Sequence, residues 1–411
     1  MLNFGGSVKL NTKVIAIAGA FLLFNLILIS NSYYSHNGIS STIDHYRTKY
    51  QKTNDVSQTI VDSKDIEGNI LFEEHFKSSG DKKSYYEKYS MQYLPNYTGE
   101  NLNHEESTLL VSLISSSAPY GRDRTYDQFF NDVLNGFNED YGKISLGLLC
   151  ITKDHFDTIK NYMRDFFQDE RIEAEKKFNK VTMIYAPFLD ENNASGRDDR
   201  QKPSFQKKRR SLIAKSRNFL INSILEFEKY ILTIDSDIIE INPDTISMFI
   251  TSKKDIIVPR IERGIQQDYD LNSWKGSRKV PTSEEFEMMK KSQQKAYQSG
   301  SRDEEYIFVP MDQEGKMEHL IDASNRLKSN RKAKVNELVE IDSVGGAVLF
   351  LKSEIWKLGI QFPPFYVIGT DWNLPLGGYD GIETEGLCYE AKILGYTCWS
   401  MPNLVAQHSE V

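Results

Sequence analysis

The chain has 411 residues, 39% of them hydrophobic, which is enough for one large domain or two ordinary ones with an ample core. Its net charge of −8, with no long basic tract, gives no indication of nucleic-acid binding. The three cysteines, Cys150, Cys388 and Cys398, are too few and too widely spaced for a zinc motif. Cys388 and Cys398 either pair in an oxidising compartment or are buried free thiols.

The N-terminal segment predicts a membrane anchor. Residues 14–34 carry no charge and are about long enough to cross a bilayer. Lys9 and Lys13 precede this stretch, and a basic flank stays cytosolic. We therefore expect residues 1–13 to form a cytosolic tail and the rest of the chain to be lumenal. The alternative is a cleaved signal peptide, but no clear site of small residues follows the apolar run.

Residues 35–106 predict a lumenal stem. They are polar, rich in Tyr, Lys and Ser, and show little sustained periodicity. The sequons at Asn96 and Asn193 are compatible with a lumenal location, although such tripeptides are frequent by chance. We place the folded domain at residues 107–411.

Strands and helices alternate after Ser107. Apolar strands are predicted to begin there, at 144–151 and at 181, and helices are predicted at 127–137 and 154–177. This alternation implies a largely parallel sheet with helices on both faces. In such sheets, ligands bind beyond the carboxyl ends of the strands.

A basic helix is predicted at residues 205–227 because its apolar positions recur at helical spacing. Arg210 and Arg217 lie seven residues apart and share one face of it. Because arginine grips diphosphate oxygens with its fork, we expect these two side chains either to contact a ligand or to pair with the acidic strand end that follows.

The strand end at residues 231–237 is a candidate metal and diphosphate site. The apolar run predicts a buried strand, and Asp235 and Asp237 follow it directly. Mn²⁺ and Mg²⁺ prefer carboxylate oxygens, and a bound diphosphate would supply further ligands. The alternative is ordinary turn chemistry, in which aspartates are common.

A possible sugar site follows at Asp270, Asn272 and Trp274. An aromatic ring beside amide and carboxylate groups is a combination that suits a sugar ring, and the alternative is an ordinary loop with one anchored tryptophan. The charged segment at 283–336 predicts exposed helices and a loop.

Residues 339–351 predict a strand with Gly345 and Gly346 in its middle. Glycine inside a strand often marks a point where a ligand or another backbone approaches closely. We therefore predict that the two glycines lie at the substrate and that Asp342, just before them, contacts the cofactor.

Glu383 and Glu385 begin a predicted helix that runs to Leu394. Glutamate in a first helical turn is favoured by the helix dipole, so capping is one explanation. Acceptor activation beside a metal and sugar site would also need such acids. His408 lies in an extended tail and is uninformative by itself.

Together and in this order, these segments resemble a fungal family of Golgi mannosyltransferases, glycosyltransferase family 62, whose members help to build the α-1,6-linked mannose backbone of N-glycan outer chains. The matching segments are ISLGLL, RRSLIAKSRNFL, LTIDSDIIEINP, DIIVPRI, YDLNSW, IDSVGGAVLFLKSEIW, FPPF, IETEG and the LGY…PN…H tail.

The resemblance implies an α/β fold of the GT-A type, a Rossmann-like mixed sheet flanked by helices. It also implies GDP-mannose as donor, a Mn²⁺ or Mg²⁺ ion and a mannose-containing N-glycan acceptor. Finally, it implies a single-pass type II protein of the Golgi membrane that associates with related mannosyltransferase subunits.

Residue by residue, the resemblance makes Asp237 and His408 metal ligands and Asp235 a second metal-site residue that contacts the donor sugar or ribose. Glu383 and Glu385 match positions for acceptor binding or acid/base work. The remaining matches are donor contacts at Arg210, Arg217 and Asn218 and substrate contacts at Asp270, Asn272 and Trp274.

The chain also departs from the family. The insertion YVIGTDWNLPLGGYDG between FPPF and IETEG is longer than the family pattern, and 283–336 is enlarged, which would reshape the acceptor site. The predicted reaction transfers mannose with retention, the leaving phosphate helping to deprotonate the acceptor. A GT-A enzyme with another sugar nucleotide and a weakly active scaffold subunit are the alternatives.

Overall fold

The computed structural model describes residues 58–60, 70–78, 84–93, 104–115, 119–121, 123–189, 203–299, 306, 308–310, 312–330, 332–374 and 377–410. The chain separates into residues 1–57 and 58–411, and all described residues belong to the second unit. The predicted cytosolic tail, membrane anchor and both sequons lie outside these ranges. No helix within them is long and apolar enough to span a membrane.

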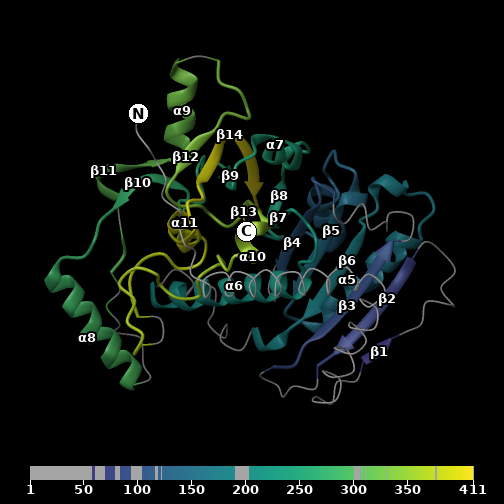
Figure 1. Cartoon of the computed structure of the whole chain (residues 1–411), viewed down its shortest axis with the longest axis horizontal. Coiled ribbons are helices and arrows are strands. Elements are labelled where there is room, and N and C mark those ends of the chain that lie inside the picture. The colour runs from purple at the N-terminus through teal and green to yellow at the C-terminus, as the bar shows by residue number, and fades with distance from the viewer. Residues whose placement is uncertain are drawn as a thin grey trace, which may run out of the picture. The chain divides into compact units, whose positions relative to one another are not determined.

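A twelve-stranded mixed sheet organises the described chain (Figure 1). Its centre is a block of four neighbouring parallel strands, and all four confirm predicted strands. In sheet order these are β6 (Lys180–Tyr185), β5 (Ile144–Cys150), β4 (Thr108–Ile114) and β7 (Tyr230–Ile234).

Largely antiparallel strands extend this block on both sides, so the sheet is mixed rather than largely parallel. Beyond β6 the sheet continues with β3 (Glu87–Tyr93), β2 (Ile70–Lys77) and β1 (Gln58–Ile60). Beyond β7 it continues with β13 (Val348–Lys352), β9 (Ile256–Glu262), β14 (Cys398–His408) and β12 (Val339–Ile341), with β8 (Ile238–Glu240) also on β14. A separate two-stranded sheet pairs β10 (Trp274–Arg278) with β11 (Asp312–His319).

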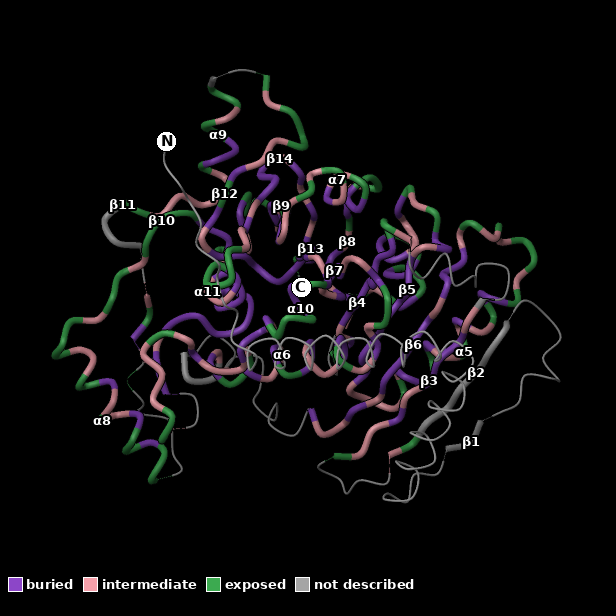
Figure 2. The backbone as a smooth tube through the Cα atoms, in the orientation of Figure 1, coloured by how far each residue is buried: buried purple, intermediate pink, exposed green. Residues whose placement is uncertain are grey.

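Helices cover both faces of the sheet, as predicted. Alternate strand residues point to opposite faces, so Leu232 belongs to one apolar cluster and Ile231 to the other. The first face carries α4 (Tyr126–Phe129), the short π-helix that continues it, α5 (Lys153–Gln168) and α7 (Thr245–Ser252). The second carries α6 (Pro203–Ile224), α10 (Ser353–Lys357) and α11 (Thr384–Ile393). Figure 2 shows the buried residues concentrated on the strands between these layers.

The charged segment after residue 283 contains two helices, as predicted, and the strand β11 between them. The helices are α8 (Ser283–Ser299) and α9 (Leu320–Asn330). Figure 1 shows α8 away from the central sheet, beside the chain that leads into α11.

The sheet begins upstream of Ser107, where we placed the start of the domain. β3 lies inside the predicted stem and pairs with β6 from Glu87 to Gln92. Its residues Tyr89 and Met91 are buried in the core, because alternate side chains of this strand face the same apolar cluster as α5.

The prediction of a single strand at residues 339–351 is wrong. The structure divides it into β12 and β13, which β9 and β14 separate in the sheet. The backbone amides of Asp342 and Ser343 both donate to the carbonyl of Trp274, which draws the chain away from the sheet before β13 begins. Gly345 and Gly346 therefore lie in a connection, not inside a strand.

The question of cysteine pairing is resolved. Cys388 of α11 and Cys398 of β14 form a disulfide, with an S–S distance of 2.07 Å and ten residues of separation. Cys150 is a buried free thiol. The disulfide therefore joins α11 to β14. Glu385 lies in the first turn of α11, and His408 is the last residue of β14.

Candidate active site

The backbone turn at the end of β7 directs the carboxylates of Asp235 and Asp237 toward different partners. The amide of Asp235 still donates to the carbonyl of Ala347, at 2.8 Å, and the Asp235 carbonyl then accepts from Ile238 in a tight turn. Beyond this turn, the Asp235 carboxylate faces Arg217 and that of Asp237 faces His408. The two acids therefore have different partners at one strand end.

β14 brings His408 from the far end of the chain to Asp237. The amide of Ser409 donates to the Asp237 carbonyl at 2.9 Å, and His408 Nε2 lies 3.1 Å from Asp237 Oδ2. His408 Nδ1 lies 2.8 Å from the Ser409 carbonyl, which fixes a proton on Nδ1. Burial lowers the pKa of His408, but the hydrogen bond and charge of Asp237 outweigh it and leave the pKa raised.

The Asp237 and His408 pair fits a hard divalent cation. Carboxylate and imidazole are both ligands for Mn²⁺, and a backbone carbonyl on the second imidazole nitrogen is the usual arrangement for a ligating histidine. The Asp235 and Asp237 side chains keep 38% and 35% of their surface exposed. Across the part of the chain that is described, no three His, Cys, Asp or Glu residues form a ready metal site, so a cation would need ligands from water or diphosphate.

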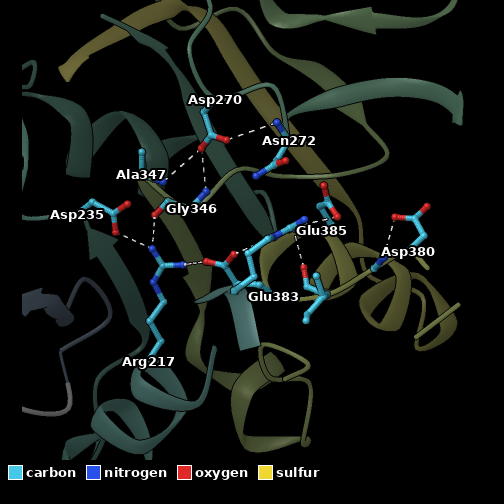
Figure 3. A network of polar contacts seen from close by, with 12 residues as sticks. Arg217, Asp235, Asp270, Asn272, Gly346, Ala347, Asp380, Glu383 and Glu385 are labelled. Atoms are coloured by element: carbon cyan, nitrogen blue, oxygen red, sulfur yellow. Dashed lines mark hydrogen bonds and ion pairs between the residues drawn. The ribbon is translucent and has the colours of Figure 1, made fainter. Parts of the chain in front are cut away.

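Arg217 joins the strand end to the start of α11 (Figure 3). Its guanidinium donates to Asp235 Oδ1 and Glu383 Oε1, both at 2.6 Å, and to the Gly346 carbonyl at 3.0 Å. Burial lowers the pKa of Arg217, but the charges of Asp235 and Glu383 raise it by more. Of the two alternatives for this residue, the structure shows pairing with the acidic strand end. Burial raises the pKa of Asp235, and Arg217 offsets only part of that rise.

A second layer of ion pairs surrounds Glu385. Its carboxylate accepts from Arg210 and from Arg278, each at 2.9 Å, and Arg278 also donates to Asp380 at 3.0 Å. Burial raises the pKa of Glu385, but the two arginines outweigh it and hold the pKa below its usual range. A carboxylate held ionised in this way suits the positioning of arginines better than proton transfer.

Glu383 has an unusual backbone conformation. It is the N-cap of α11, with φ 61° and ψ −131°, and its side chain lies between Arg217 and Arg210. Such a conformation costs a non-glycine residue about 1–3 kcal/mol and persists only where its surroundings over-determine it. Here two arginines and a bond from its amide to the Pro363 carbonyl, at 2.8 Å, hold it in place.

Asp270 fills the space beside the two glycines. Its Oδ2 accepts from the amides of Gly346, at 2.9 Å, and Ala347, at 3.4 Å. A Cβ on Gly345 would lie 1.9 Å from the same oxygen, so the close approach that requires glycine comes from this carboxylate. Burial raises the pKa of Asp270 to about 6, with further contributions from the charges of Asp235 and Glu383.

Other predicted site residues make structural contacts. Asn218 clamps the backbone of Phe362 through both ends of its amide, at 2.8 and 3.1 Å. Trp274 is only 3% exposed and lies beneath the Arg278 guanidinium, which matches an anchored tryptophan better than an open sugar platform. Asp342 binds the Gly276 amide and Lys392. The backbone amide of Asn272 reaches Asp270.

Arg278 and Asp380 were missed by sequence reasoning. They lie 102 residues apart and meet only because β10 and the chain before α11 converge on Glu385. No spacing or motif near either residue carries that information.

The fold and the site define a class of protein. Acidic and arginine side chains gather at the carboxyl end of a parallel strand in a mixed α/β sheet, the position where such sheets bind charged ligands. A sequence model of the Anp1 family matches residues 85–366, which is more than half of the chain. The chain therefore belongs to the Anp1 family.

Curated relatives are named as subunits of mannan polymerase complexes. The chain is 25% identical over 327 residues to mannan polymerase complex subunit MNN9 of Candida albicans, covering 75% of this chain and 76% of that one. It is 26% identical over 346 residues to mannan polymerase complex subunit mnn9 of Schizosaccharomyces pombe, covering 79% and 86%. The mannan polymerase I complex VAN1 subunit of Saccharomyces cerevisiae is 29% identical over 244 residues, covering 57% and 39%.

Solved structures are more distant. GalNAc-T7 with UDP, GalNAc and Mn²⁺ aligns with a TM-score of 0.37 at 12% identity, covering 74% of this chain and 43% of that one. Staphylococcus aureus TarS aligns with a TM-score of 0.36 at 11% identity, covering 74% and 60%. At this level the likeness carries no argument about the site.

Proposed function

We propose that this chain is a metal-dependent mannosyltransferase with a GT-A-type domain, which transfers mannose from GDP-mannose to a mannoside acceptor. The observation that carries the proposal is the pairing of Asp237 with His408 at the end of β7, next to the Asp235–Arg217 ion pair. Membership of the Anp1 family, and relatives named as mannan polymerase subunits, support it.

The chain's own residues would position the donor. Asp237 and His408 would hold Mn²⁺ or Mg²⁺, which neutralises the charge of the departing diphosphate when bound. Asp235, oriented by Arg217, would face the donor sugar or ribose, and Asp270 accepts from the amide of Gly346, whose carbonyl Arg217 also binds. Such preorganised charges can supply most of the rate enhancement in a group transfer.

The acceptor hydroxyl would attack the anomeric carbon from the side of the leaving phosphate. That phosphate would take the hydroxyl proton, so the new glycosidic bond keeps the configuration of the donor. We propose α-1,6 elongation of N-glycan outer chains as the outcome, in a Golgi type II membrane protein associated with related subunits.

The proposal is tested by incubating the full chain with Mn²⁺ and a panel of sugar nucleotides. We expect turnover of GDP-mannose with a mannoside acceptor, and its loss in Asp237→Ala. The control is Asp132→Ala, which removes an aspartate whose side chain is 57% exposed in a surface ion pair. Turnover of a UDP-sugar instead would exclude the donor that we propose.

Metal binding has its own measurement. Titration of Mn²⁺ by electron paramagnetic resonance should show one site that both Asp237→Ala and His408→Ala weaken. If neither substitution changes the titration, the cation does not bind at this strand end. If cells that carry the Asp237→Ala variant elongate mannan normally, the chain is a scaffold subunit rather than an enzyme.

A further inference from the structure

Two segments that are distant in the sequence form one lobe beside the acid–arginine network. We call α8 together with residues 365–374 and 377–380 the α8 lobe. Gln293 of α8, only 4% exposed, exchanges two hydrogen bonds with the backbone of Gly378, at 3.1 and 3.4 Å. Figure 1 shows the chain before α11 running alongside α8. The two segments that depart most from the family pattern thus support each other.

The α8 lobe is tied to the candidate active site at both ends. At its far end, Asp380 pairs with Arg278, which also binds Glu385. At its near end, the lobe begins two residues after Pro363, whose carbonyl accepts from the amide of Glu383 at 2.8 Å. Two residues of extended chain span at most about 7 Å, so the start of the lobe lies close to Glu383.

The tip of the lobe presents an open tryptophan face. The side chain of Trp372 is 79% exposed, and its ring meets Phe365 edge-on, with the ring centres 5.2 Å apart. Both the amide and the side chain of Asn373 donate to Asp371 Oδ1, at 3.0 and 3.2 Å, which fixes the backbone turn around the indole. Phe365 therefore contacts the ring, while most of the surface of Trp372 stays accessible.

We propose that the tip of the α8 lobe is an acceptor subsite, where Trp372 stacks on a sugar ring of an oligosaccharide beyond the ring that reacts. This inference rests on the proposed transferase function. The flat apolar face of a pyranose matches an indole, and the polar side chains of Asp371 and Asn373 stand beside it to bind hydroxyl groups.

The chemistry of the lobe favours a glycan over a protein partner. A stable protein interface needs about 800 Å² on each side, with a core depleted in charge. The exposed residues of α8 include Glu284, Glu287 and Lys291. Met288 and Tyr297 of α8 are also exposed, at 54% and 55%, but exposed lysines lie between them along the helix. The Trp372 ring, with Asp371 and Asn373 beside it, is the right size for one sugar ring.

The test compares acceptors of different length. In the full chain, Trp372→Ala should raise the KM for α-1,6-linked mannotetraose about tenfold, while the KM for methyl α-mannoside and for GDP-mannose stays unchanged. Trp372→Phe should restore most of the affinity. The matched control is Phe227→Ala, which removes an aromatic side chain that is 60% exposed near the opposite, amino end of β7. Equal effects on both acceptors, or no effect on either, would overturn the proposal.

Direct binding separates this inference from the proposed function. Saturation-transfer NMR with mannotetraose and no donor should show contacts that disappear in Trp372→Ala. If the wild-type chain transfers no sugar but still binds mannotetraose through Trp372, the subsite stands and the proposed function fails. If transfer occurs and Trp372→Ala binds mannotetraose normally, the subsite is refuted. A change in oligomeric state caused by Trp372→Ala would assign the ring to a protein interface and refute it as well.

Discussion

Replacement of Arg217 by methionine should destabilise the fold strongly, because this arginine is the charge that compensates two acids. Methionine keeps much of the side-chain volume but removes the guanidinium. Asp235 would then lose the arginine that binds it, and Glu383 would keep only Arg210, at 3.3 Å. Breaking a buried ion pair by removing one partner costs about 3–5 kcal/mol of the free energy of unfolding.

The contacts do not contribute equally to this cost. The Glu383 pair has side chains only 4% and 9% exposed, so it carries most of the cost, although Arg210 remains 3.3 Å from Glu383. The Asp235 side chain is 38% exposed, and solvent screening reduces its share to about 1 kcal/mol or less. The bond to the Gly346 carbonyl adds about 1 kcal/mol. Because the three share one guanidinium they are not additive, and we expect about 3–5 kcal/mol in total.

Urea unfolding of the wild type, Arg217→Met and Arg217→Met/Glu383→Gln measures this cost. The double variant should recover most of the loss, since neutral glutamine leaves no buried charge unpaired. The control is Arg171→Met. Arg171 makes two hydrogen bonds to Asp169, at 2.8 and 2.7 Å, but its side chain is 90% exposed, so its loss should change the free energy of unfolding little. A loss for Arg217→Met no larger than that of the control, or no recovery in the double variant, would refute the reasoning.

Three further outcomes are expected. Replacing Cys388 and Cys398 together by serine should cost about 3 kcal/mol of the free energy of unfolding, measured in urea, because the disulfide closes a loop of about ten residues. Gly345→Ala should lower transfer about a hundredfold, measured at saturating donor, because its Cβ would displace the Asp270 carboxylate. Asp270→Asn should raise the melting temperature at pH 8 and leave it unchanged near pH 4. The pKa of about 6 exceeds the unfolded value, so this acid costs the fold stability above pH 6, and the cost fades as the pH falls to 4.

Local pattern was sufficient for the centre of the fold. From β4 to β7, each strand is a short apolar run and each long helix carries apolar residues at helical spacing, so each signal lies within one element. The helix predicted at 154–177 ends early, at Gln168, because the buried Lys177 ammonium binds the carbonyls of Phe167 and Asp169 and closes the helix end. That closure depends on a contact from beyond the helix.

Pairing between distant segments could not be predicted in the same way. β3 is polar enough to resemble a stem, and only its register against β6 shows that Tyr89 faces the core. The run at 339–351 is continuously strand-like, yet its two halves occupy different places in the sheet. The meeting of Asp237 with His408 was implied by family resemblance alone, since a histidine in a tail carries no signal of its own.

Local sequence patterns also failed to predict two features that lower the stability of the fold. Glu383 holds a backbone conformation that glycine would adopt more easily, and Asp270 is a carboxyl group whose pKa burial has raised. The backbone conformation of Glu383 and the buried charge of Asp270 each cost stability, although the ion pair of Glu383 with Arg217 offsets the cost at that position. Asparagine at position 270 would remove the cost of the buried charge. The raised pKa of Asp270 marks a negative charge beside Gly346 that no arginine of the described chain binds directly, and the cation of the proposed function would relieve it.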